Sequence, residues 1–456
     1  MMNLGMIVYF VFTSLIIVTI FFRKKPILIA AFGIMVVGIA EMKSIIGGVQ
    51  VAFRGLLFTA TDLLPIILLI GLVIAMTDML KTTQADEIIT KPFLKIRNVF
   101  ALYWLLGLSL WLLTLFLWPT PAVTLLGAVA LPIIANTKIH PLGLASGFCI
   151  FGAVGLAGDY IIQGAPGLLA QASGVEVEQV ISESIPLVIG SGIVASSLGY
   201  WKLLKTNKSN PIGHKKPNSP KSEEPNSSNR TLYRKKKKSK IVAMIVISAY
   251  TLTIFWLLLS GLRGDNAAAA TGGVSIAVLI LGTVLFNYKT ALNTFVLHIQ
   301  NGLKVSMGVF APIVVIAGFF LLGTQSGSEL ILNRSGPGYL ELLALQLSGL
   351  IYINEFTSAI IVIIAAVLGA MSGSGFSAIP LVGGVAAALG EVSGVPVVPL
   401  AVLGQVAAIW TDAMIIPWGF PAVVSAVTRT EAINVGIQNI LPWFAALAFV
   451  FIWTVI

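Results

Sequence analysis

The sequence has very little charge for its length. Of its 456 residues, 10% are charged and 57% are hydrophobic, whereas soluble domains carry about 25% charged residues. The single cysteine, Cys149, excludes an internal disulfide and a cysteine metal cluster. The three histidines, His140, His214 and His298, stand at unrelated places, and the chain has no phosphate-binding loop, H-E-x-x-H or G-x-S-x-G motif. From these absences we expect that the protein is not an enzyme, is not an ATP-driven pump and binds no cofactor.

Apolar runs, by contrast, recur along the whole chain. A membrane span takes about 20 residues, and most of these runs approach that length. Arg23-Lys24-Lys25 follows the first run without a small-residue cleavage site, so we expect a retained helix and not a signal peptide. The pattern predicts an all-α polytopic membrane protein. The runs are 4–22, 26–40, 62–80, 99–117, 142–157, 184–201, 241–260, 268–287, 305–323, 355–370, 397–410 and 436–456.

Basic residues concentrate in one polar segment. Residues 202–240 contain 13 of the 28 lysines and arginines, among Pro, Ser and Asn. Such a segment cannot bury a core, so we expect a disordered cytoplasmic linker. Anionic lipid head groups explain its charge better than nucleic acid does. The linker separates a first transmembrane repeat, residues 1–201, from a second, residues 241–456.

The two halves match one another in sequence. At a shift of 256 residues, AVTLLGAVA at 122–130 lies on AIPLVGGVA at 378–386, with five of nine residues identical. At a shift of 247, PIILLIG at 65–71 lies on PIVVIAG at 312–318. Several matches in the same order and at similar offsets predict an internal duplication.

Charge predicts the orientation of both halves. We assume five crossings and one dipping segment in each half, with Arg23-Lys24-Lys25 inside. All of the 28 basic residues then lie on the cytoplasmic side except Lys43, Arg54, Arg263 and Arg334, as the positive-inside rule requires. Both chain termini are extracytoplasmic in this arrangement. Because five is odd, the two repeats are inverted relative to each other.

Each half contains a segment in which a helix stops and then resumes. In residues 99–134 the stop is Trp118-Pro-Thr-Pro121, and in residues 356–389 it is Ser372-Gly-Ser-Gly375. Paired prolines and paired glycines end a helix sharply. We expect re-entrant hairpins, because these preserve the charge balance; two ordinary spans joined by a tight turn are the alternative.

A second kind of break contains an aspartate. GDYIIQGAPG at 158–167 interrupts an apolar run, and a shift of 255 lays its Gly-Ala-Pro on the Gly-Phe-Pro of TDAMIIPWGFP at 411–421. Unwound backbone inside a bilayer must line a polar cavity, and the ends of half-helices present partial charges there. Paired breaks in two inverted halves therefore predict a transport site.

Hairpins, broken helices and inverted repeats together resemble the ion transporter superfamily. That group includes gluconate and lactate permeases, divalent-anion/sodium symporters and the large membrane subunits of TRAP transporters. The resemblance is architectural and covers nearly the whole chain outside 202–240. The Ser-Asn-Thr tips of the divalent-anion symporters are absent here, which argues against a dicarboxylate substrate. The amphipathic stretches 44–58 and 288–302 fit the family's lateral helices and imply a possible homodimer.

The resemblance also implies where solute and sodium bind, namely between the hairpin tips and the broken-helix loops. By position, the implied substrate-binding residues are Thr120, Ser372, Ser374, Ser377, Gln163 and Thr411.

Asp159 and Asp412 share a pseudo-symmetric position in the two breaks. A buried charge costs at least about 2.5 kcal/mol in a membrane, so it needs a partner or a role. We expect both aspartates to hold a coupling cation, Na⁺ or H⁺, together with freed backbone carbonyls. The alternative is that each caps the half-helix that follows it. Glu355, at the mouth of the second hairpin, is a possible gate or a solvated carboxylate.

The chain is thus expected to be a secondary active transporter in the cell membrane that works by alternating access. Because no Lys or Arg falls within an expected span, two functions stay open. One is Na⁺- or H⁺-coupled symport of a small organic anion, which the resemblance favours. The other is Na⁺/H⁺ antiport through Asp159 and Asp412.

Overall fold

The protein is helical throughout the part of the chain that the structure describes. This computed structural model describes all residues except 1–3, 23, 25, 92–95, 97, 138, 210–228, 337, 341, 344–352 and 372. In the described part every regular element is a helix, and nine helical stretches are long and apolar enough to cross a membrane. The prediction of an all-α polytopic membrane protein is confirmed.

The helices of the two halves correspond in chain order, from α1 with α10 to α9 with α19. The first half contains α1 (Leu4–Phe21), α2 (Ile27–Met42), α3 (Ile45–Thr82), α4 (Ala85–Thr90), α5 (Val99–Leu117), α6 (Pro119–Asn136), α7 (Pro141–Ala157), α8 (Gly164–Ser173) and α9 (Val177–Ser209). The second half contains α10 (Asn229–Ser260), α11 (Gly264–Phe286), α12 (Ala291–Leu321), α13 (Gln325–Leu332), α15 (Glu355–Ala370), α16 (Gly375–Ser393), α17 (Val397–Ile415), α18 (Phe420–Thr428) and α19 (Ala432–Val455).

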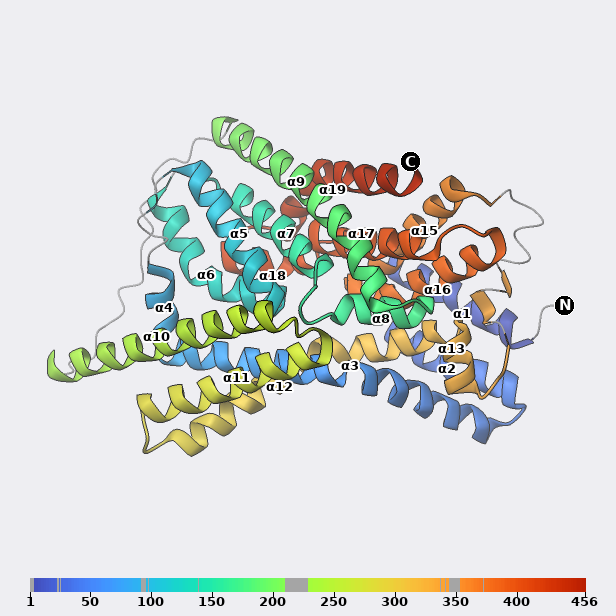
Figure 1. The fold of residues 1–456 in the computed structure, drawn as a ribbon, viewed down its shortest axis with the longest axis horizontal. Helices are drawn as coiled ribbons and strands as arrows, with labels where there is room; N and C mark the ends of the chain where they lie inside the picture. Colours follow the sequence, from blue (N-terminus) through green and yellow to red (C-terminus); the bar gives the residue numbers. More distant parts are fainter. Residues whose placement is uncertain are drawn as a thin grey trace.

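Packing follows the same correspondence. In the first half α1 packs on α2, α5 on α7 and α7 on α9; in the second half α10 packs on α11, α15 on α17 and α17 on α19. Figure 1 shows α3 and α10–α12 along one side of the molecule and α5–α9 with α15–α19 on the other. These contacts agree with the duplication expected from the sequence, which stays a prediction, as does the inverted orientation expected from the charges.

The two long helices α3 and α12 form a close crossing at the centre of their layer. A Cβ added to Gly302 of α12 would collide with the carbonyl oxygen of Gly71 and with Ala75, both on α3. The hydroxyl of Ser306 donates a hydrogen bond to the Ile67 carbonyl across the same contact, at 2.7 Å. Small residues let two backbones approach in this way, and direct backbone contact stabilises helix pairs in membranes.

One sequence expectation about these two helices is not met, because the amphipathic stretches are not separate lateral helices. Residues 44–58 continue into the following span as α3, of 38 residues, and residues 288–302 continue into α12, of 31 residues. Nothing between stretch and span stops the helix. In α3 the hydroxyls of Thr59 and Thr61 donate to the carbonyls of Gly55 and Leu57, one turn earlier. At about 1.5 Å per residue, α3 is longer than a hydrocarbon core of about 30 Å.

Helices also extend into the expected linker from both sides. α9 continues to Ser209 and α10 begins at Asn229, so the expectation of disorder is not met at the two ends of 202–240. Some of its lysines have structural partners: the Lys238 ammonium donates to the carbonyl of Phe286, the last residue of α11, at 2.7 Å. Residues 210–228 lie outside the described part.

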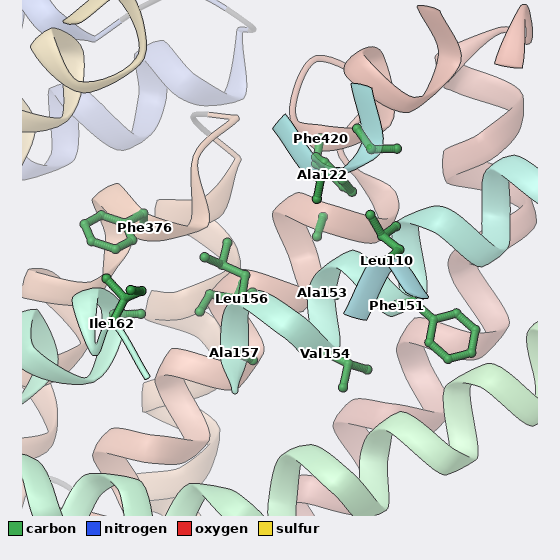
Figure 2. Close-up of a cluster of buried hydrophobic side chains, with 14 of the residues drawn as sticks. Leu110, Ala122, Phe151, Ala153, Val154, Leu156, Ala157, Ile162, Phe376 and Phe420 are labelled. Carbon is green, nitrogen blue, oxygen red and sulfur yellow. The ribbon is translucent and has the colours of Figure 1, made fainter. Parts of the chain in front are cut away.

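The second helix of each hairpin packs against the other half. α16 contacts α8 of the first half, and α6 contacts α18 of the second. Figure 2 shows the resulting mixture of side chains, in which Leu156 and Ile162 of the first half share a cluster with Phe376 and Phe420 of the second. The buried core is therefore shared by both copies, and neither copy completes it alone.

The α3–α12 crossing gives a stability prediction. Gly302→Leu forces the two backbones apart, and overpacking of this kind typically costs about 1–3 kcal/mol. We expect a lower thermal unfolding midpoint for the purified variant in detergent. The matched control is Gly273→Leu in α11, because Gly273 is exposed and a Cβ there meets no atom within 4 Å. Equal losses of stability in both variants would contradict a close crossing.

Candidate functional site

The first helix break lies between α7 and α8 and is organised by Asp159. Its carboxylate accepts a hydrogen bond at 2.7 Å from the amide of Gly164, the first residue of α8. The amides of Gln163 and Ala165 are also directed at it. Because Asp159 is only 3% exposed, these donors take the place of water, and the carboxylate neutralises the positive end of the α8 dipole. Its geometry is that of a helix cap.

The second break lies between α17 and α18 and is organised differently around Asp412. The amides of Gly375 and Phe420 are directed at its carboxylate, and these are the first residues of α16 and α18. The carboxylate thus joins the break to the tip of the second hairpin. Its Oδ1 atom has no hydrogen-bond partner among the described residues, although the residue is only 8% exposed. A buried carboxylate oxygen without a partner is costly unless a ligand or ion fills the position.

Carbonyl groups freed by the two breaks find side-chain partners in the second half. The Gln405 amide of α17 donates to the carbonyl of Ala157, the last residue of α7, at 3.2 Å. The Asn439 amide of α19 donates to the Met414 carbonyl at 3.0 Å, and its oxygen accepts a hydrogen bond from the Ser146 hydroxyl of α7. These polar side chains make unwound backbone tolerable within an apolar interior.

A cavity of about 410 Å³ lies at the second break, and we name it the tip cavity. It is lined by both hairpin tips, by the second break, by α12 and by the start of α2. Four residues expected at the site from the sequence meet there: Thr120, Ser374, Ser377 and Asp412. Ser372, also expected there, lies outside the described residues.

A second cavity, of about 450 Å³, lies at the first break, and we name it the α8 cavity. Gln163 lines it, together with residues of α3, of α8 and of the start of α11. The amide of Gly264, the first residue of α11, donates to the Ile161 carbonyl within the break at 3.1 Å. The hairpin tips do not contribute to this cavity within the described part of the chain.

The two cavities have corresponding walls. Thr61, Leu63, Pro65 and Ile66 line the α8 cavity, and at the shift of 247 their counterparts are Gly308, Phe310, Pro312 and Ile313, which line the tip cavity. At the shift of 255, Gln163, Gly164 and Leu168 correspond to Trp418, Gly419 and Val423, which again line one cavity each. At the offsets expected from the sequence, each break is therefore accompanied by a cavity with corresponding lining positions.

Three expected site residues line neither cavity. Thr411 donates to the Ala407 carbonyl and accepts a hydrogen bond from the indole of Trp443, so it faces α19. Asp159 caps α8. Glu355 is exposed in the first turn of α15, where it lines a shallow surface hollow, and this placement favours a solvated carboxylate.

Sequence reasoning missed the aromatic residues of the tip cavity, which are Trp118, Phe310, Phe376, Trp418 and Phe420. An aromatic residue in an apolar chain gives no contrast that would mark it. Gln405 and Asn439 were also missed, although a signal existed. Each is an amide in an otherwise apolar run, and such residues in a membrane span usually face a partner.

Comparison with known proteins supports a transporter-type fold. No known protein-family profile matches the chain. It is 32% identical over 459 residues to a membrane protein of Bacillus subtilis (strain 168), YhfA, described as uncharacterized; the match covers 97% of this chain and 96% of YhfA. The fold is similar to that of the Alcanivorax borkumensis YdaH transporter, whose crystal structure is described as having an unusual topology. The TM-score is 0.52 and the identity 14%, over 89% of this chain and 88% of that one. The ion transporter superfamily itself stays a prediction.

The capping geometry of Asp159 gives a prediction about charge. Asp159→Ala leaves buried amides at the start of α8 without an acceptor, which costs roughly 1–3 kcal/mol, whereas Asp159→Asn keeps an acceptor oxygen and caps nearly as well. We expect the alanine variant to unfold at a clearly lower temperature in detergent and the asparagine variant to stay close to wild type. Equal losses in both variants would show that the negative charge matters and not the cap.

Proposed function

The chain belongs to the same family as the Bacillus subtilis membrane protein YhfA, and from its transporter-type fold and its two matching cavities we propose that it is a secondary active transporter. In this proposal a coupling cation, H⁺ or Na⁺, drives the movement of a small solute by alternating access. Nothing in the mechanism requires a catalytic step or a cofactor. The homodimer implied by the lateral stretches also stays a proposal.

The observation that carries the proposal is the pair of equivalent cavities. Pro26 and Ile27, at the tip cavity, directly follow the basic cluster 23–25. Gly264, at the α8 cavity, directly follows Arg263, one of the few basic residues expected outside. By the positive-inside rule the tip cavity then opens toward the cytoplasm and the α8 cavity toward the other side. In alternating access one site is reached first from one face and then from the other, and a hollow on each face would supply the two routes.

Asp412 is the residue we propose for coupling. Asp412 lines the tip cavity, and its Oδ1 atom, which is covered by Gly419, has no hydrogen-bond partner among the described residues; a proton on this carboxylate, or a cation in the cavity beside it, would balance its charge. Asp159 has the corresponding position, but amides of the α8 start already surround its carboxylate. Although the sequence suggested an equivalent pair of coupling residues, the geometry supports coupling at Asp412 and a capping role for Asp159.

Of the two transport modes open at the sequence level, the cavity supports cation exchange better than anion symport. The residues that line the tip cavity in the described part of the chain include one acidic residue, Asp412, and no Lys, Arg or His. Symport of an organic anion would place its charge near this carboxylate, with hydroxyls such as Thr120 as donors. Exchange of H⁺ against another cation at Asp412 needs only groups that the wall contains.

Proteoliposomes with an acidic interior and an enclosed pH-sensitive dye test the coupling. We expect an external cation, taken from a panel of Na⁺ and organic cations, to collapse the pH gradient. Asp412→Asn should slow this exchange at least tenfold, since the variant cannot alternate between a proton and a cation, and the matched control Asp159→Asn should behave as wild type. Gradient-driven uptake of a carboxylate would establish symport instead. If no gradient moves any solute of a broad panel, transport itself is contradicted.

The opposite openings of the cavities can be tested with single cysteines. Replacing Cys149, the one cysteine of the sequence, by Ala removes the background thiol. Thr61→Cys and Gly308→Cys then form a matched pair, since both positions are exposed, line a cavity and correspond at the shift of 247. We expect a membrane-impermeant thiol reagent to label position 308 from the cytoplasmic side and position 61 from the other side. Labelling of both from one side would contradict alternating access through these cavities.

A further inference from the structure

We propose that the tip cavity binds a small organic cation with a substituted ammonium group, held by the Asp412 carboxylate against an aromatic wall. This inference rests on the proposed function and assigns its solute class. It departs from the organic anion expected from the sequence, and three features of the cavity carry it: the aromatic wall, the state of Asp412 and the lack of donors for an anion.

The aromatic wall comes from three elements that are distant in sequence. The ring of Trp118, at the first hairpin tip, lies 5.4 Å from that of Phe376, at the second tip, and 6.0 Å from that of Phe310 on α12. The rings of Phe310 and Phe376 are also 6.0 Å apart. All three residues line the cavity. Phe310 and Phe376 are 0% and 3% exposed, so they support the half-buried Trp118, whose ring supplies the accessible aromatic surface of this wall. Aromatic faces attract ammonium groups and are commonly used to bind quaternary amines.

Asp412 lines the same cavity as these rings. The two amides directed at its carboxylate belong to Gly375, which precedes Phe376, and to Phe420, and both phenylalanines line the same cavity. Asp412 is 92% buried, and its Oδ1 atom is covered by Gly419 and has no hydrogen-bond partner among the described residues. A positively charged group in the cavity would be attracted by the charge of this carboxylate and would contact the Trp118 ring at the same time.

An anion would find few donors in the same cavity. The start of α6 has Pro119 and Pro121 among its first three residues, and proline has no N–H. At the start of α16, the amide of Gly375 is directed at Asp412, and the amide of Ser377 donates to the Ser374 hydroxyl. The positive ends of these helices are therefore already engaged or lack donors, although such ends often bind anions.

The start of α18 also offers few free N–H groups to an anion. Its first amide, that of Phe420, is directed at Asp412, and its second residue is Pro421. Among the described basic residues, Lys24 is the one nearest in sequence to a residue that lines the cavity, since it lies two residues before Pro26. Lys24 is exposed and does not line the cavity itself. Its charge is therefore at the rim and solvated, and it does not compensate Asp412 within the cavity.

The size of the cavity indicates an organic molecule and not a bare ion alone. About 410 Å³ falls within the range of about 300–1,000 Å³ that is usual for small-molecule sites. Most of its lining is apolar, while Na⁺ prefers a shell of oxygens. A proton and an ammonium compound can alternate at Asp412, and this provides the exchange required by the proposed function.

Three molecules of the same shape and different charge test the proposal. Choline carries one positive charge, 3,3-dimethylbutan-1-ol replaces its nitrogen by carbon and is neutral, and 3,3-dimethylbutanoate is its anionic counterpart. Binding to the purified full-length protein is measured by calorimetry in a maltoside detergent, because a phosphocholine detergent would compete. We expect choline to bind at least tenfold more tightly than the alcohol, and the carboxylate to bind more weakly than both.

Variants separate the two parts of the site. Asp412→Asn should weaken choline binding at least tenfold and leave the alcohol unchanged, and Asp159→Asn is the matched control. Trp118→Leu keeps an apolar side chain but removes the half-buried ring of the wall, so it should weaken choline several-fold and the alcohol less. Thermal unfolding of each variant verifies that it is folded, and Trp118→Leu still tests the proposal if Asp412→Asn does not fold.

The outcomes distinguish this inference from the proposed function. No choline binding, equal binding of choline and the alcohol, or tightest binding of the carboxylate would each overturn the organic-cation class. Exchange of H⁺ against Na⁺ in proteoliposomes would still leave the transporter intact in those cases. Conversely, choline binding with the expected variant pattern, but without flux under any gradient, would support the site chemistry and overturn the transport function.

Discussion

Inside a bilayer, every backbone N–H and C=O group needs a partner from the protein itself, and the architecture around the two breaks depends on this constraint. Opening α7 and α17 frees carbonyls at one end and amides at the other. Gln405 and Asn439 supply donors for the carbonyls of Ala157 and Met414. Asp159 and Asp412 supply acceptors for the amides. Because Gln405 of the second half serves the break of the first, the two halves have to be packed together before the first break is tolerable.

Most of the fold could be predicted because its determinants are local or repeated. Prolines and glycines stop α5 before Pro119 and α15 before Gly375, and the matched breaks follow from the duplication. The prediction of separate lateral helices failed for a different reason. The amphipathic stretch and the span that follows it read as two elements because their composition differs, yet no residue between them ends the helix, so α3 and α12 are continuous. Helix ends depend on stop signals, and a change in polarity is not one.

The site residues could be predicted where the two halves of the sequence match one another, and they could not be predicted elsewhere. Thr120, Ser374, Ser377 and Asp412 do gather around one cavity, because hairpin tips and breaks meet in the packing. Thr411 faces α19 although it precedes Asp412, since successive residues of a helix point to different faces. The aromatic wall was invisible in the sequence: Phe310 belongs to an apolar run like any other, and only the tertiary contacts bring it to Trp118 and Phe376.

The two breaks also differ in how completely their carboxylates are satisfied. Asp159 is surrounded by amides of one half-helix, whereas Asp412 is shared between two helix starts and retains an unpartnered oxygen. The first break is thus closed by backbone amides of its own half-helix, whereas the second is not fully closed. A chain in which both breaks had the arrangement of the first would keep both helix starts capped and would leave no carboxylate oxygen open. Only the second break therefore keeps a carboxylate oxygen without a donor among the described residues.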